Sequence, residues 1–175
     1  MNNKTKNLNE QLQKANALTA ANRPELIALE KFTKSLNAKP KNQHIKKRQG
    51  AAYLPISQIE NELDRLFAGL WQTENFNYVI NGGSVSVSIE LKVFNPVAKV
   101  WLTRCGVGAA LIRNSKNALE MDLPHAKADA IKNAAKSLGD IFGRNLTRKD
   151  SDTTEYEPAL LNRLKALNNE HTNEK

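Results

Sequence analysis

Residues 84–94 show the strictest alternation of apolar and polar side chains in this chain. An apolar residue occupies every second position from Val85 to Val93, and serine, glutamate or lysine stands at each position between them. Successive side chains of a β-strand point to opposite faces, so this pattern predicts a strand with one face in a core and the other in water. The apolar face needs another element to cover it.

Shorter apolar segments flank this strand on both sides. An Asn-Gly step at 81–82 precedes it and can adopt the positive φ angles of a tight hairpin turn, and an Asn-Pro step at 95–96 follows it. We therefore expect outer strands over about 76–80 and 97–103. The three strands would form an antiparallel sheet.

The alanine-rich segment 126–143 has the spacing of a helix that covers such a sheet. At about 100° per residue, one face collects apolar side chains with i, i+3, i+4, i+7 spacing: Ile131, Ala134, Ala135, Leu138, Ile141 and Phe142. A neighbouring stripe combines positive charge with small residues: His125, Lys132, Lys136, Gly139 and Gly143. Such a stripe suits the close approach of a polyanion, although lysines on a helix usually form a solvated face.

Further helices are expected around this core. The pair Ser57 and Glu60 forms a capping-box pattern, and the helix that follows would turn one apolar face inward: Ile59, Leu63, Leu66, Phe67, Leu70 and Trp71. Two amphipathic helices, over 7–20 and from Pro24, would precede it. A leucine-rich helix over 159–168 would end the chain.

The segment 104–122 is interpreted as a connection from the third strand to the alanine-rich helix. It contains Gly106 and Gly108, which we interpret as breaks in regular structure, and Asp122 can cap the helix. The expected fold is therefore α+β: a helix, a three-stranded antiparallel sheet and a long alanine-rich helix, with additional N-terminal and C-terminal helices. Residues 1–50 would form a basic arm with a linker over 37–50, residues 51–149 the core domain, and residues 150–175 an acidic linker and helix.

Positive charge is concentrated in the amino-terminal arm. The chain has a net charge of +8, and residues 1–50 alone hold 11 Lys or Arg against 3 Asp or Glu. The arm therefore favours an acidic polymer as partner, nucleic acid first and anionic membrane second.

Motifs for catalysis, metal binding and membrane insertion are missing from the sequence. No glycine-rich phosphate loop precedes a lysine-serine pair, the single Cys105 allows no intrachain disulfide, and His44, His125 and His171 lie far apart. We expect no enzyme activity, no metal and no cofactor. The first residues lack the apolar core of a secretion signal and no run could span a bilayer, so we expect a cytoplasmic protein without a membrane partner.

Four sequence segments resemble the annealing core of the Rad52-type single-strand DNA annealing proteins. They are YLPISQIENELDRLF, SVSVSIELKV, GVG and KNALEMDLPHAKADAIKNAAKSLGDIFGRNL, and together they extend from about Tyr53 to Leu146. The resemblance implies an ATP-independent protein that forms an oligomeric ring, binds single-stranded DNA in a basic groove and pairs it with its complement during homologous recombination or repair. A phage or bacterial recombinase is the better match, which implies the cytoplasm of a bacterial cell or phage-infected host. A single-strand binding protein or exonuclease would be a further partner.

The resemblance also implies a set of DNA-binding residues. Lys132 matches a groove lysine of the family, whereas Asn133 replaces a residue that is basic in eukaryotic relatives, and Gln58 replaces a groove arginine. Other basic residues can supply charge, including Lys92 and Lys99, which the second hairpin is expected to bring together. The remaining candidates are Arg104, Lys136 and Arg144 in the core and Lys46, Lys47 and Arg48 in the linker.

Three other functions stay open on the sequence. A double-stranded RNA binding domain has the same helix, three-strand, helix order, but its lysines cluster at the start of a last helix that follows a short loop. Here the helix opens DLPHAK after a long connection. A structural oligomer or adaptor is the next alternative, and a nuclease is the last because it would need a metal cluster.

Overall fold

The computed structural model describes residues 24–114, 117–149 and 155–172. Their contacts form two units, one within residues 35–154 and one that joins the chain before residue 35 to the chain after residue 154. The expected helix over 7–20 lies outside the described residues, and the predicted domain division stays a prediction. Among the described residues, no helix combines the length and apolar character needed to cross a membrane.

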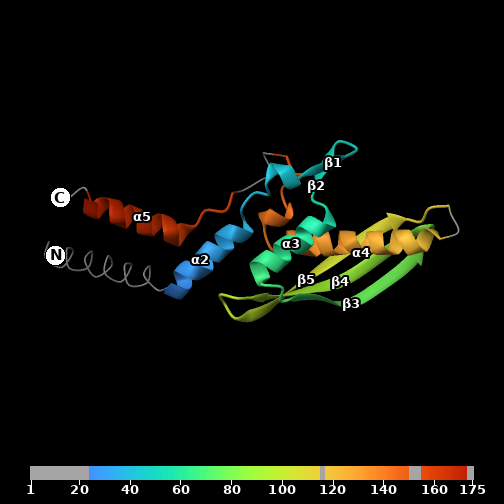
Figure 1. Ribbon diagram of the computed structural model, residues 1–175, viewed down its shortest axis with the longest axis horizontal. Helices are drawn as coiled ribbons and strands as arrows, with labels where there is room; N and C mark the ends of the chain where they lie inside the picture. The colour runs from blue at the N-terminus through green and yellow to red at the C-terminus, as the bar shows by residue number, and fades with distance from the viewer. Residues whose placement is uncertain (1–23, 115–116, 150–154, 173–175) are drawn as a thin grey trace, which may run out of the picture. The chain divides into compact units, whose positions relative to one another are not determined.

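The larger unit is built on a three-stranded antiparallel sheet, as predicted (Figure 1). Its strands run in the order of the sequence: β3 (Trp71–Asn81), β4 (Ser84–Asn95) and β5 (Val100–Leu111). A long helix, α4 (Ala118–Lys136), lies along one face of the sheet and contacts β5 and β4. The α+β fold class is therefore confirmed.

The central strand β4 carries the core. Its alternate apolar residues from Val85 to Val93 are no more than 2 % exposed, whereas Ser86 and Ser88 between them are exposed. The predicted alternation is confirmed, because α4 and a second helix, α3 (Ile56–Phe67), cover the apolar face while the other face stays open to water.

The turns of the sheet differ from prediction in detail. Gly82 and Gly83, with φ of 56° and 81°, form the two-residue turn between β3 and β4, which shifts the predicted Asn-Gly turn by one residue. Both central residues of this turn type need positive φ, and two glycines adopt it without strain. In the second hairpin Thr103 lies opposite Lys92 and Lys99 lies in the turn, so the predicted pairing of Lys92 with Lys99 is wrong.

The third strand is longer than predicted. Residues 104–111 continue β5 instead of forming a connection, and only residues 112–117 join β5 to α4. Gly106 and Gly108 are positions of close packing: a Cβ at Gly106 would overlap the carbonyl oxygen of Ala130, and one at Gly108 would overlap that of Ala126. The glycines interrupted the apolar pattern from which a strand is predicted, yet they allow the helix to lie directly on the strand.

The helix α4 begins earlier and ends earlier than predicted. It spans Ala118–Lys136, and a short 3-10 helix, η2 (Asp140–Phe142), follows it. The predicted apolar face is buried throughout, including Leu138 and the two apolar residues of η2. The residues after the end of the helix remain buried because the chain turns back onto the same core.

The helix α3 (Ile56–Phe67) buries the four predicted residues from Ile59 to Phe67. It has no side-chain cap: Pro55 precedes its first residue, so the predicted capping box is wrong. It ends at Ala68 in the left-handed conformation, and Leu70 is exposed.

Residues 37–50 are not the unstructured linker that the charge pattern suggested. They contain a 3-10 turn, η1 (Asn42–His44), and a strand β1 (Lys46–Arg48) that pairs with β2 (Ala51–Tyr53). The hairpin escaped prediction because β1 reads Lys-Lys-Arg and shows no apolar alternation.

The smaller unit includes most of α2 (Pro24–Leu36) and all of α5 (Ala159–Thr172). Both helices were predicted, and Pro24 begins α2 as its fixed φ favours. The two carboxylate oxygens of Glu30 accept the backbone N–H groups of Leu160 and Leu161, at 2.8 and 2.6 Å. Glu30 thus satisfies two of the unpaired donors at the start of α5.

The close packing of β5 on α4 makes a prediction about stability. Replacing Gly106 by alanine should reduce the free energy of unfolding by about 2 kcal/mol or more, because the added methyl group must displace backbone. Urea unfolding would measure the change. Cys105→Ala is the matched control, since the exposed neighbour should change stability by less than about 0.5 kcal/mol. Equal stability of Gly106→Ala and the wild type would show that the helix does not need the close approach.

Candidate nucleic-acid interface

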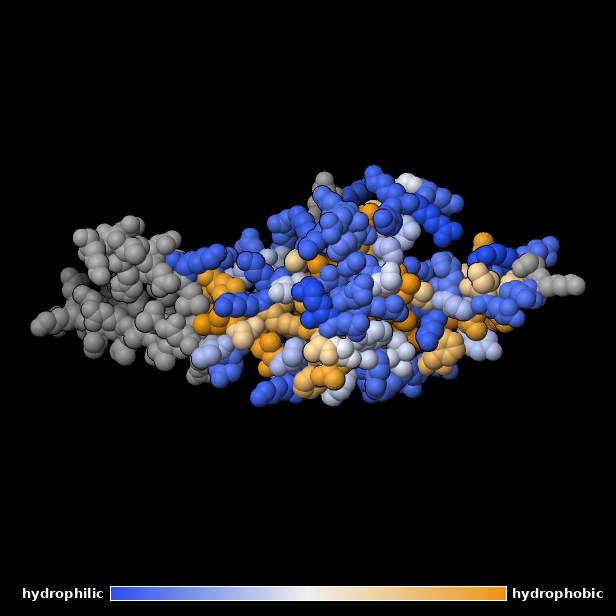
Figure 2. All heavy atoms as spheres, in the orientation of Figure 1, coloured by the Kyte–Doolittle hydropathy of each residue, from blue (hydrophilic) through white to orange (hydrophobic). Residues whose placement is uncertain are grey.

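A groove runs between the β1–β2 hairpin, the edge of β5 and the exposed side of α4. It consists of three adjoining hollows of about 430, 490 and 570 Å³. The first two share Tyr53, Asp129 and Lys132, and the second and third share Arg48 and His125. Figure 2 shows hydrophilic residues over the hairpin and an indentation beside it.

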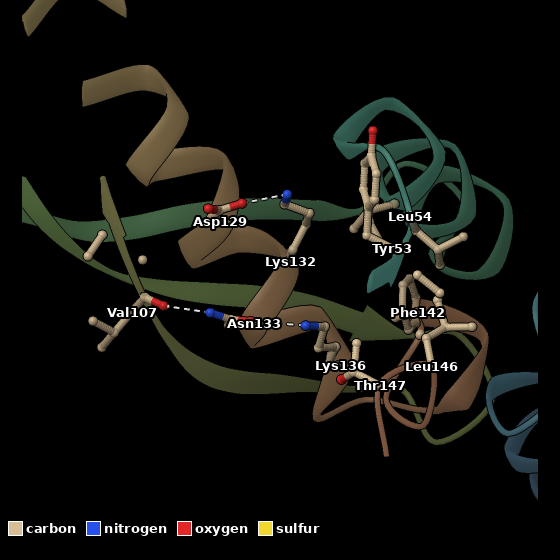
Figure 3. Close-up of a pocket in the computed structure, with 15 residues that line it drawn as sticks. Tyr53, Leu54, Val107, Asp129, Lys132, Asn133, Lys136, Phe142, Leu146 and Thr147 are labelled. Atoms are coloured by element: carbon tan, nitrogen blue, oxygen red, sulfur yellow. Dashed lines mark hydrogen bonds and ion pairs between the residues drawn. The ribbon is translucent and has the colours of Figure 1, made fainter. Parts of the chain in front are cut away.

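Lys132 of α4 lies at the centre of the groove (Figure 3). Its ammonium is 2.5 Å from one carboxylate oxygen of Asp129, and its side chain is 20 % exposed. The two residues lie three positions apart on α4, the spacing at which opposite charges on a helix meet. The other oxygen of Asp129 lies 3.9 Å from Nε2 of His125, one turn earlier on the helix.

Lys136 lies one turn after Lys132 and lines the same hollow. Its ammonium donates to the side-chain oxygen of Asn133 at 3.3 Å, and the Asn133 amide donates to the carbonyl of Val107 at 2.8 Å. Asn133 therefore satisfies a backbone acceptor at the open edge of β5. Both contacts are visible in Figure 3.

The hairpin supplies the opposite wall. Tyr53 of β2 is 38 % exposed, and the Lys132 ammonium lies 5.9 Å from its ring centroid. Arg48 of β1 lines the second and third hollows and has no ion-pair partner among the residues described. Tyr53 was missed as a site residue, and the only signal was an aromatic residue close after a basic run.

The remaining candidates lie away from the groove lining or serve the backbone. Lys46 and Lys47 are exposed on β1. Arg144 donates to the carbonyls of Lys136 and Ser137, at 2.9 and 3.1 Å, and so caps the end of α4. Gln58 donates to Glu62 within α3, Arg104 donates to the carbonyl of Thr103, and Lys99 lies in the turn after β4.

Lys92 lies on the opposite face of the sheet from α4. It alternates with the buried residues of β4 and pairs with Glu74 of β3 at 2.5 Å. The hydrogen bond with Glu74 raises the pKa of Lys92, and the same contact lowers the pKa of Glu74. Lys92 therefore does not share a surface with Lys132.

The third hollow contains an ion pair between a buried carboxylate and an exposed arginine. Asp122, 2 % exposed, accepts the side chain and the backbone N–H of Arg113, both at 2.8 Å. The predicted role of Asp122 as the residue that caps α4 is wrong, because it lies within the helix and fixes the segment after β5. This pair therefore orders the rim of the groove.

The groove combines cations, an exposed aromatic ring and small residues. Lys132, Lys136 and Arg48 can neutralise phosphates, and Tyr53 offers a face on which a base can stack. In the described part of the chain, no three His, Cys, Asp or Glu side chains are grouped as metal ligands would be. The groove therefore offers cations on both walls that can contact phosphates and one ring on the hairpin that can stack a base.

Comparison with known proteins identifies one family. The family model described as Rad52/22 family double-strand break repair protein matches residues 27–158, more than half of the chain. The comparison with curated proteins gave no match. The match includes every residue that lines the groove.

The groove makes a prediction about binding. Lys132→Ala and Lys136→Ala should each weaken single-stranded DNA binding by about threefold to tenfold, since each removes a phosphate contact. Lys136→Ala should also reduce the slope of log affinity against log salt by about 0.7. Fluorescence anisotropy with a labelled oligonucleotide would measure both.

Lys92→Ala is the matched control, because it removes the same charge from the opposite face of the sheet. It should change affinity by less than about twofold, and all three variants should keep the melting temperature of the wild type within a few degrees. Equal losses in Lys92→Ala and Lys136→Ala would contradict the assignment of DNA to the groove.

Proposed function

Because this chain belongs to the Rad52/22 family of double-strand break repair proteins, we propose that it binds single-stranded DNA in the groove and anneals complementary strands without ATP. The observation that carries the proposal is the meeting of Lys132, Lys136 and Arg48 with the exposed ring of Tyr53 in one groove. These residues come from two segments that are far apart in the sequence.

Annealing fits a site of this kind because the reaction breaks no covalent bond. The protein has to neutralise phosphate repulsion between two strands and keep the bases available for pairing. The two lysines along the helix wall, together with Arg48 opposite them, supply the first requirement. A single aromatic ring on the other wall supports a base without enclosing it, which leaves the pairing edges of the strand accessible.

We also propose that copies of the chain assemble into a ring. The short groove of one subunit contacts few nucleotides, and a ring would join neighbouring grooves into a longer path. Apolar side chains support an interface: Phe76, Tyr78 and Ile80 of β3 are half-exposed, and Met121 of α4 is 61 % exposed. Exposed apolar residues in such number favour a protein contact.

Double-stranded RNA binding remains the alternative that an experiment has to exclude. In the sequence, a long predicted connection before the last helix argued against a double-stranded RNA binding domain. In the structure this connection is short, because only residues 112–117 join β5 to α4. The order of elements therefore does not distinguish the two classes. The family match favours DNA repair, and duplex RNA is the appropriate competitor in binding assays.

The proposed function predicts rapid pairing of complementary strands. Two fluorescently labelled complementary oligonucleotides should pair at least about tenfold faster with the purified protein than without it, because phosphate neutralisation lowers strand repulsion. The reaction should proceed without nucleotide triphosphate. Stopped-flow energy transfer would measure the rate. Binding without faster pairing would leave a single-strand binding protein, and preferential binding of duplex RNA would support the alternative.

Tyr53 provides a second test of the groove. Tyr53→Ala should weaken single-strand binding by about fivefold to tenfold, because base stacking on an aromatic ring contributes about 1–3 kcal/mol. Tyr53→Phe retains the ring and should bind within about twofold of the wild type. The loss should be similar at low and high salt, unlike that of Lys136→Ala. Equal weakening by both substitutions would point to the hydroxyl group rather than stacking.

A further inference from the structure

The central cation of the groove is already paired with an acidic residue. Asp129 lines the first two hollows beside Lys132, and its carboxylate oxygens lie 2.5 Å from the Lys132 ammonium and 3.9 Å from His125. Its side chain is 31 % exposed, so the carboxylate faces the space that a strand would occupy. An acidic group in this position opposes the binding of a phosphate.

The other groove cations differ from Lys132 in this respect. Arg48 and Lys136 have no acidic partner among the residues that the structure describes, and the contact of Lys136 is with the neutral amide of Asn133. A phosphate can approach these two without displacing a carboxylate. At Lys132 it must either compete with Asp129 or leave an unpaired carboxylate beside the strand.

We propose that Asp129 competes with the DNA phosphate for Lys132 and so limits how tightly the groove retains a single strand. The inference rests on the proposed function. In the unbound protein, Asp129 neutralises Lys132; in the complex, a phosphate replaces it, and the carboxylate retains His125 as its neighbour. The exchange replaces one anion by another, so binding at Lys132 releases fewer counterions than binding at a free lysine.

This competition suits a protein that must also release its strands. Once two strands have paired, the duplex has to leave the groove, and a carboxylate beside the central lysine can take the place of the departing phosphate. Removing the competitor should therefore strengthen binding and slow release together. A residue whose role is only to orient Lys132 would have the opposite effect, because its loss would weaken binding.

Asp129→Asn is the informative substitution. Asparagine keeps an oxygen that can accept the Lys132 hydrogen bond and has nearly the same shape, but it removes the charge. It should strengthen binding of a labelled oligonucleotide about fivefold at low salt and steepen the slope of log affinity against log salt by about 0.7, the value for one further lysine whose phosphate contact releases a counterion from a single strand. Dissociation measured with excess unlabelled strand should slow by a similar factor. Asp129→Glu retains the negative charge and should bind like the wild type.

Glu74→Gln is the matched control. It also neutralises a carboxylate that lies 2.5 Å from a lysine ammonium and changes the net charge by the same amount, but on the face of the sheet away from α4. It should change affinity by less than about twofold. Equal gains in affinity in the two variants would show that only the net charge of the protein matters, and would overturn the inference. Unchanged or weaker binding by a folded Asp129→Asn protein would also overturn it and would assign Asp129 to positioning Lys132.

A double-mutant cycle tests whether Asp129 acts through Lys132. In the Lys132→Ala background, Asp129→Asn should give a smaller gain in affinity than in the wild type, because there is no lysine ammonium for the substitution to free from its ion pair. Equal gains in both backgrounds would show that Asp129 repels DNA without involving Lys132. If the wild type itself fails to bind single-stranded DNA, both the proposed function and this inference are wrong. If the wild type binds but the variants do not behave as described above, only this inference is wrong.

Discussion

The groove depends on the direct contact between α4 and β5. Gly106 and Gly108 allow the backbone of the helix to lie against the strand at Ala126 and Ala130, where any larger residue in the strand would overlap a carbonyl oxygen. Because the helix lies so close, the residues beside its buried alanines emerge at the edge of β5. This is how Asp129, Lys132 and Asn133 come to line the groove, and it couples the stability of the fold to the geometry of the interface.

Few residues supply the chemistry of the groove. One helix supplies the lysines, a short hairpin supplies an arginine and an aromatic ring, and Asn133 satisfies the edge of β5 with a hydrogen bond to Val107. The central lysine is shared between an internal carboxylate and, as proposed, an external phosphate. A surface of this kind binds through exchange of ions, which is reversible and sensitive to salt. These are useful properties where strands must be bound, paired and released.

The candidate site was predictable where helical spacing determined it and unpredictable elsewhere. Lys132 and Lys136 follow from the position of a stripe beside an apolar face, and the Asp129 pairing follows from a separation of one turn. Arg48 and Tyr53 could not be placed, because a strand that reads Lys-Lys-Arg gives no periodic signal. Lys92 failed as a groove residue for a different reason: alternation placed it correctly on the polar face of β4, but the sequence does not say which face of a sheet meets a ligand.

The sequence by itself determined the central strand, the buried face of α4 and the α+β class, since periods of two and 3.6 residues are properties of a single local segment. Tertiary structure decided the length of β5, the role of its two glycines and the hairpin that closes the groove. Each of these depends on a partner distant in the chain: a glycine is a break or a packing position according to what lies against it, and a basic segment becomes a strand when a neighbour pairs with it. The groove is therefore formed by contacts between distant segments, although most of its charged residues belong to the single helix α4.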